Sequence, residues 1–375
     1  MLNMARKFGK KNVIKIDPLA YNLGLIGESG IGKTTLAKEV CEKLVGEDGY
    51  MILNIGKEDG VDAIPNASYE NVPDWDTFEA IVDDIVENRT TDYKDLKVLV
   101  YDTFDELMRI TEPEVIRLHN KENPEKRVKS IKAAFGGYMG GEDKAIEIVL
   151  DKIWELKNVG VAMFVVGHTK KRTMTDVVTG LEYDMLTTNM SNRYFNAIKT
   201  KLHVLGVASI NRSIEQKKVK QKVGADKIVG TVVDESRIIT FRDDNFNIDS
   251  KSRFEEIIPS IALDTDEFIK AIEDAIKAAH EKQKGTKGDI EQVKKEQAKT
   301  KDKEIKNKVK ETNESKVNVD ENEELAEVIK VNFPSTTDDV KAQVKDIMTE
   351  YGFTSFKNAD EIPTVALRKI VDLLK

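Results

Sequence analysis

Short apolar runs alternate with helix-like segments from about residue 12 to residue 260. Four of the runs are almost continuously apolar and lie at residues 23–26, 50–55, 97–102 and 161–167. Runs of this kind are typical of strands that are buried on both faces of a parallel sheet. Apolar residues recur instead at helical spacing over residues 34–44 and 142–157. The alternation predicts an α/β fold with right-handed crossovers and a mainly parallel central sheet.

The pattern changes after residue 203. Residues 203–210 and 228–244 are interpreted as strands that extend the sheet with antiparallel pairs, with a turn at residues 234–236. A separate hairpin is expected to turn at Thr179–Gly180. A helix is then expected to begin after Asp264, which would cap it with Glu267 as the reciprocal partner.

The last quarter of the chain differs in composition from the rest. Residues 281–323 are highly charged and hold too few apolar side chains to build a core. Helical patterns return at residues 338–351, which Gly352 closes, and from Pro363 onward. We therefore predict a core over residues 1–280, a charged linker or solvated helix over 281–323, and a small helical module over 324–375.

Composition narrows the possible partners and compartments. The net charge is −8, so a nucleic-acid surface would have to be a local basic patch. The chain has one cysteine, Cys41, which excludes an intramolecular disulfide. No signal peptide or membrane-spanning run is recognised in the sequence. These features predict a cytoplasmic protein without a membrane partner.

The stretch LGLIGESGIGKTTLAKEV carries the most specific motif in the chain. Residues 27–34 match the pattern G-x-x-x-x-G-K-[ST] in full, between a predicted strand and a predicted helix. In such a loop the backbone N–H groups surround phosphate oxygens, Lys33 would reach the β- and γ-phosphates, and the Thr34 hydroxyl would bind Mg²⁺. The ligand is expected to be ATP, because no N-K-x-D guanine-reading motif is recognised. The predicted nucleotide-binding residues of this loop are Gly27, Glu28, Ser29, Gly30, Ile31, Gly32, Lys33, Thr34 and Thr35.

A magnesium site needs a second acidic group, and LVYDTFDEL provides one. Asp102 follows a predicted buried strand and would hold Mg²⁺ through water. The alternative interpretation is an ordinary helix cap, for which Asp102 or Thr103 would also serve. Asp105 and Glu106 are expected on the following helix and are the weaker candidates for this site.

Hydrolysis also needs a group that orients or polarises the attacking water. Glu58 and its neighbour Asp59 lie just past the second predicted strand, where a carboxylate can face the γ-phosphate. The residues K-E-D-G are equally ordinary in a solvated turn. Spacing alone therefore leaves both the catalytic carboxylate and the plain turn open.

The order of these motifs resembles the RecA-type ATPase core. The GKTT of the loop, a carboxylate after the second strand, LVYDTFDEL, and VAMFVVGHTKKR with a polar residue after a later strand all occur in that order. The resemblance covers about residues 12–261. It is greatest to phage-encoded nucleotide-binding proteins that lack the recombinase's extra N-terminal domain, some of which act as single-strand annealing or recombination ATPases.

The resemblance implies roles for residues that spacing alone leaves open. It implies that Glu58 is the catalytic glutamate and that His168 senses the γ-phosphate. The recombinases usually carry glutamine or asparagine in place of such a histidine. It also implies that basic residues of a neighbouring subunit complete the ATP site, with Lys251 and Arg253 as candidates. A plain surface turn is the alternative for those two residues.

Basic runs suggest where a polymer ligand would bind. Residues 168–173 and 217–222 are rich in lysine, and the second run is expected between two strands. Mobile lysines attract phosphates with little sequence preference. Ordinary solvated loops carry the same kind of lysine run, so that interpretation stays open. Residues 135–143 are expected to form a flexible loop that either gates the site or contacts a neighbour.

The sequence as a whole predicts an oligomeric ATPase with a RecA-like core. This ATPase would use ATP and Mg²⁺ and act on single-stranded DNA in phage-type recombination or annealing. Two alternatives remain. One is a P-loop small-molecule kinase, for which residues 170–172 would be the lid. The other is an ATP-dependent loader or switch that recruits a replication partner through the C-terminal module.

Overall fold

The computed structural model describes residues 12–57, 60–175, 179–219, 227–242, 249–284, 290–315, 319–356, 358–359 and 362–374. These residues divide into two compact units. The first unit comprises the chain up to residue 82 together with residues 94–300, and the second comprises residues 83–93 and 301–375.

The described strands of the first unit form one sheet in the order β10-β8-β7-β1-β5-β4-β2-β3, with β6 paired to β5 and β9 paired to β7. The strands are β1 (Leu23–Gly27), β2 (Tyr50–Ile55), β3 (Tyr69–Val72), β4 (Val98–Asp102), β5 (Ala162–Thr175), β6 (Glu182–Thr188), β7 (Val204–Val219), β8 (Lys227–Thr240), β9 (Lys251–Ser252) and β10 (Ser260–Ala262). The neighbouring strands β7, β1, β5, β4, β2 and β3 are parallel to one another. The strands β6, β8, β9 and β10 pair antiparallel with their neighbours. The predicted α/β fold is therefore confirmed.

Helices alternate with these strands and follow them along the chain. The α-helices are α1 (Lys33–Val45), α2 (Trp75–Glu87), α3 (Phe104–Glu122), α4 (Gly140–Asn158), α5 (Asn192–Lys199), α6 (Thr265–Lys284), α7 (Ile290–Ser315), α8 (Val319–Asn332), α9 (Asp338–Glu350) and α10 (Thr364–Leu374). Short 3-10 helices lie at Pro18–Ala20, Glu47–Gly49, Gly60–Ala63, Pro124–Lys126, Ile131–Ala133 and Phe333–Ser335.

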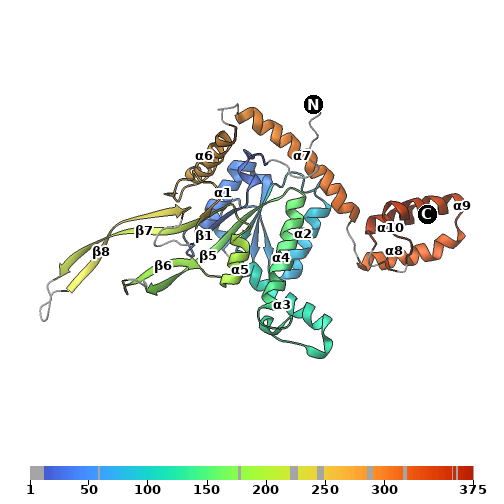
Figure 1. Ribbon diagram of the computed structural model, residues 1–375, viewed down its shortest axis with the longest axis horizontal. Helices are drawn as coiled ribbons and strands as arrows, with labels where there is room; N and C mark the ends of the chain where they lie inside the picture. Colours follow the sequence, from blue (N-terminus) through green and yellow to red (C-terminus); the bar gives the residue numbers. More distant parts are fainter. Residues whose placement is uncertain are drawn as a thin grey trace, which may run out of the picture. The chain divides into compact units, whose positions relative to one another are not determined.

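Helices cover both faces of the central sheet (Figure 1). On one face, Leu36 of α1 and Phe268 of α6 join the same apolar core as Leu25 of β1. On the other face, the ring of Phe78 from α2 contacts that of Tyr101 from β4. Every residue of β1 and β4 is buried, which explains why their sequences are continuous apolar runs and not alternating ones.

Two antiparallel ribbons extend from the sheet on the same side of the first unit (Figure 1). In the first, β5 continues past the buried Gly167 and pairs with β6 from Thr169 to Thr175. The hairpin expected around Thr179–Gly180 is thereby confirmed, and Gly180 has a φ of 71°. In the second ribbon, β7 pairs with β8 over most of its length.

The turn expected at residues 234–236 is wrong, because β8 runs through these residues without a break. The pairing of β7 with β8 instead shows a register shift between Ser213 and Ile214, opposite this part of β8. Polar residues such as Asp234, Glu235 and Ser236 occur in exposed strands as well as in turns, so their composition does not distinguish the two structures. Lys217 and Lys218, expected between strands, lie within β7, and the rest of that basic run lies outside the described residues.

Two local expectations are changed in detail. The flexible loop expected over residues 135–143 is shorter, because α4 already begins at Gly140. The start of α6 is capped as expected, since Asp264 Oδ1 accepts the N–H of Glu267 at 3.0 Å. Glu267 Oε2 accepts the backbone N–H of Ala262 at 3.0 Å, and not that of the cap residue Asp264 as a reciprocal cap would.

The second unit has its own apolar core. The helices α8, α9 and α10 enclose a cluster that includes Ile329, Val344, Leu367 and Ile370. The two helices expected near the C-terminus are present, and Gly352 follows α9 with a φ of 76°. Within residues 281–323, the described part is helical. None of the helices in the described ranges combines the length and the apolar character needed to cross a membrane.

Candidate nucleotide-binding site

The glycine-rich loop joins the end of β1 to the start of α1. Gly30 and Gly32 have φ angles of 75° and 110°, which residues with a side chain rarely adopt. Gly27 is needed for a different reason, because an added Cβ would lie 2.8 Å from the backbone oxygen of Ala208 on β7. The sequence therefore folds here into a tight loop at the N-terminus of α1, the geometry that binds phosphate groups.

Lys33 is the first residue of α1 and is only 5% exposed. Its Nζ donates to the backbone oxygens of Gly27 at 3.1 Å and of Glu28 at 3.0 Å. The ammonium group is thus held over the loop by carbonyl groups that a phosphate oxygen can replace. Lys33 therefore lies at the junction of the glycine-rich loop and α1.

Thr34 and Asp102 meet although 68 residues separate them. The Thr34 hydroxyl donates to Asp102 Oδ2 at 2.6 Å. Asp102 is the last residue of β4 and is 5% exposed. Because β1, β5 and β4 are adjacent and parallel, their C-terminal ends share one edge of the sheet, and this edge brings the two side chains together.

The oxygen atoms around this pair suit a magnesium ion. Mg²⁺ prefers oxygen ligands and keeps several waters, and Thr34 and Asp102 offer a hydroxyl and a carboxylate. Two further oxygens, Thr103 Oγ1 and Asn54 Oδ1, are buried with no hydrogen-bond partner among the described residues. Asn54 is the register partner of Asp102 between β2 and β4. When bound, Mg²⁺ would neutralise charge on the β- and γ-phosphates.

His168 also lies at this edge of the sheet. It is the register partner of Gly27, so it stands one strand away from the first residue of the loop. The expectation that the strand over residues 161–167 ends just before His168 is wrong, because β5 continues to Thr175 as part of the ribbon with β6. Asp105 of α3 accepts a hydrogen bond from the His168 backbone N–H at 2.8 Å and lies 3.0 Å from its Nδ1.

Several contacts of the loop were not predicted. Arg237 of β8 donates to the backbone oxygen of Ile31 at 3.2 Å, and Lys171 of β5 lies 3.8 Å from the Glu28 carboxylate. Both residues come from ribbon strands whose pairing with the core is not visible in sequence periodicity. The basic run at residues 170–172 is the sequence signal that could have indicated the ion pair with Glu28.

Lys251 and Arg253 lie at the opposite edge of the sheet. Lys251 belongs to β9, which pairs with the first residues of β7, whereas Gly27 is level with Ala208 farther along β7. Lys251 Nζ donates to the backbone oxygen of Lys199 at 2.6 Å, and Arg253 donates to that of Thr200 at 2.6 Å. The structure therefore does not bring these two residues to the glycine-rich loop of their own chain.

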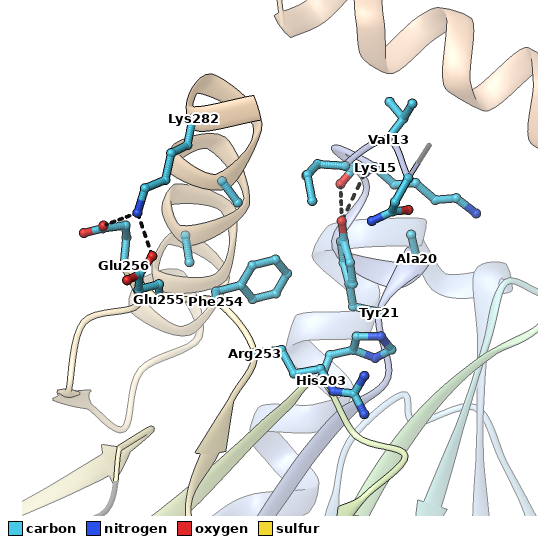
Figure 2. A pocket seen from close by; sticks show the side chains of 14 residues that line it. Val13, Lys15, Ala20, Tyr21, His203, Arg253, Phe254, Glu255, Glu256 and Lys282 are labelled. Atoms are coloured by element: carbon cyan, nitrogen blue, oxygen red, sulfur yellow. Dashed lines mark hydrogen bonds and ion pairs between the residues drawn. The ribbon is translucent and has the colours of Figure 1, made fainter. Parts of the chain in front are cut away.

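Arg253 also lines a pocket at this opposite edge, together with Tyr21, His203 and Phe254 (Figure 2). Burial, together with nearby Arg253, Lys157 and Lys251, lowers the pKa of His203 to about 4, so this histidine is neutral at pH 7. His203 Nδ1 accepts the backbone N–H of Asn22 at 3.0 Å. The pocket is distinct from the glycine-rich loop.

The remaining predicted residues divide into two groups. Glu28, Ser29, Ile31 and Thr35 lie in the loop or the first turn of α1, as expected. Glu58 and Asp59 lie outside the described residues, so the choice of the catalytic carboxylate stays a prediction.

Comparison with known proteins identifies the family to which this chain belongs. Residues 20–254, more than half of the chain, match the family described as AAA domain. No curated protein matches the chain. A solved structure, described as a prototypical ATPase from the type III secretion system of pathogenic bacteria, is 13% identical with a TM-score of 0.31. The match covers 52% of this chain and 54% of that one, so this chain spans about half the length of the solved protein. The match over residues 20–254 shows that the chain belongs to the AAA domain family.

Proposed function

We propose that the protein binds ATP with Mg²⁺ at the glycine-rich loop and hydrolyses it. The observation that carries this proposal is the 2.6 Å contact between the Thr34 hydroxyl and the Asp102 carboxylate. It joins the residue after Lys33 to the acidic C-terminal end of β4, two strands away from β1, which is the arrangement that holds Mg²⁺ beside the phosphates. Membership of the AAA domain family supports nucleotide binding and hydrolysis.

Glu58 is the residue we propose to orient the attacking water. It follows β2, which pairs with β4 and so ends at the same edge of the sheet as Asp102. A carboxylate in this place would accept a proton from the water as it attacks. The proposal rests on the resemblance to the RecA-type core and on the position of β2.

The ATPase proposal is tested by measuring phosphate release from ATP with and without Mg²⁺. Turnover that requires Mg²⁺ supports it, and an ATP affinity without any turnover would leave only a binding protein. Thr34→Ser keeps the hydroxyl and serves as the matched control for Thr34→Val, which removes it while keeping the side-chain shape.

Single-stranded DNA is the ligand that we propose to be coupled to this site, in phage-type recombination or annealing. β5 and β7 flank β1, and each continues into a ribbon beyond the sheet (Figure 1). The β5 ribbon presents Lys170, Lys171 and Arg172, which are exposed and suit a phosphate backbone. Since Lys171 also approaches Glu28, a polymer on this ribbon would be close to the nucleotide loop. The recombination role itself draws on the RecA resemblance.

Oligomerisation belongs to the same proposal. Lys251 and Arg253 cannot serve the ATP site of their own chain, since they lie at the far edge of its sheet. We propose that they complete the site of a neighbouring subunit. Burial and the neighbouring cations Arg253 and Lys199 lower the pKa of Lys251, so an incoming anion would stabilise its charged form.

One alternative has a specific observation in its favour. The second unit encloses its own apolar core, as a recruitment module would, which suits an ATP-dependent loader or switch. The kinase alternative has less support, because its lid candidates, residues 170–172, belong to a paired strand. ATP turnover measured with and without single-stranded DNA separates these functions, since only the first proposal expects DNA to raise the rate.

A further inference from the structure

The side chain of Asp105 is directed at a single residue. Its Oδ2 accepts the backbone N–H of His168 at 2.8 Å and lies 3.0 Å from the ring Nδ1 of the same histidine. Both side chains are mostly buried, with Asp105 12% and His168 20% exposed. One carboxylate oxygen therefore fixes both the backbone and the ring of His168.

This arrangement defines the protonation state of the ring. An ionised carboxylate can only accept hydrogen bonds, so the proton of a neutral His168 lies on Nδ1. Nε2 is then the acceptor nitrogen, and it becomes a donor only when the ring is charged. The neighbour of a histidine commonly determines in this way which of its two nitrogens serves a ligand.

The surroundings favour a role for the pair beyond packing. Asp105 Oδ1 is buried and has no hydrogen-bond partner among the described residues, which is costly for a carboxylate. Gly167 permits the close approach, because an added Cβ there would lie 3.4 Å from Asp105 Oδ1 and 3.1 Å from Ile26. An N–H that the adjacent imidazole donates to Oδ2 therefore stabilises this buried carboxylate.

The pair also stands beside the proposed ATP site. His168 is level with Gly27 on β1, and Asp105 is three residues after Asp102. We propose that Asp105 is a positioning residue that holds His168 in the Nδ1-protonated tautomer and so prepares it to contact the nucleotide phosphates. This inference rests on the proposed ATPase function and adds a residue to it.

The first test reads the tautomer in nucleotide-free protein. In ¹⁵N-histidine-labelled protein, long-range NMR spectra distinguish Nδ1–H from Nε2–H, and His168→Gln assigns the signal among the four histidines. We expect the Nδ1–H form in the wild type and in Asp105→Asn, whose amide oxygen still accepts both bonds. Asp105→Leu should lose it. An unchanged tautomer in Asp105→Leu would overturn the inference.

The second test is a double-mutant cycle on ATP turnover. Asp105→Leu should lower kcat roughly 10- to 100-fold, the range found when the group that orients a metal-ligating histidine is removed. Its ATP affinity should stay within about twofold, because the loop contacts remain. In a His168→Gln background the same change should add less than about twofold, since Asp105 acts through the histidine. An equal loss in both backgrounds would contradict the inference.

Controls keep the two proposals separable. Glu114→Leu removes another buried carboxylate from the same helix, one that pairs with Arg117, and should leave kcat unchanged. If Asp105→Leu does not fold, Asp105→Ala takes its place in both tests. A wild-type protein without ATP turnover would reject the proposed function alone, and the tautomer measurement would then decide on the Asp105–His168 pair.

Discussion

Thr34→Val is the substitution that examines the magnesium site most closely. Valine keeps the branched shape of threonine but removes the hydroxyl that donates to Asp102 Oδ2 at 2.6 Å. Hydrogen bonds to a charged group contribute about 1.5–3 kcal/mol, and Asp102 is only 5% exposed. We therefore expect the free energy of unfolding without nucleotide to fall by about 1.5–2 kcal/mol. Urea titrations of the wild type, Thr34→Val and Thr34→Ser measure this loss.

The same variant should separate nucleotide binding from magnesium binding. The backbone loop and Lys33 are unchanged in Thr34→Val, so its ATP affinity in EDTA should match the wild type. The additional affinity that Mg²⁺ provides should fall at least about tenfold, or about 1.4 kcal/mol, because a direct oxygen ligand is lost. Calorimetric titrations with and without Mg²⁺ measure both quantities. If Thr34→Val keeps the full magnesium effect while Thr34→Ser behaves like the wild type, our assignment of the metal site is wrong.

Three further predictions concern other parts of the chain. Glu58→Gln should keep ATP binding and lose most of its turnover, and the reverse result with Asp59→Asn would identify the other carboxylate. His203 has a lowered pKa of about 4, so the unfolded chain binds more protons between about pH 6.5 and 4. Stability should therefore decrease as the pH falls through this range, and less so in His203→Gln, as melting curves at each pH would show; equal slopes would count against this. Removal of residues 301–375 should leave the ATP-dependent shift in melting intact, because the described site residues all precede residue 300, and loss of that shift would mean that the tail belongs to the catalytic unit.

The central sheet could be predicted because burial on both faces leaves a clear sequence pattern. The apolar run at residues 50–55 coincides with β2, and the run at 23–26 with most of β1. The ribbons could not be predicted equally well. Beyond Gly167, β5 is held by hydrogen bonds to β6 and not by burial, so its exposed basic residues resemble a loop.

The candidate site was predictable where local sequence determines local geometry. Gly30 and Gly32 belong to one continuous loop that Lys33 follows directly as the first residue of α1, and Asp102 ends an apolar strand. The contact of Asp105 with His168 joins residues 63 positions apart and depends on β4 and β5 being neighbours. Strand order of this kind follows from the packing of the whole sheet, so no local pattern could have selected Asp105 over Glu106.

Steady-state ATP turnover of the wild type and of Lys33→Ala tests the central claim most directly. Without ligand, Lys33 Nζ donates to the loop carbonyls of Gly27 and Glu28. Hydrogen bonds of a charged group contribute about 1.5–3 kcal/mol, so Lys33→Ala should lower the free energy of unfolding by about that amount and still fold. With ATP and Mg²⁺, the variant lacks the charge that we propose to face the β- and γ-phosphates, and turnover should fall at least about 100-fold. We predict a folded and inactive variant beside an active wild type. Equal turnover in the two proteins would contradict the assignment of this loop as the site of ATP hydrolysis.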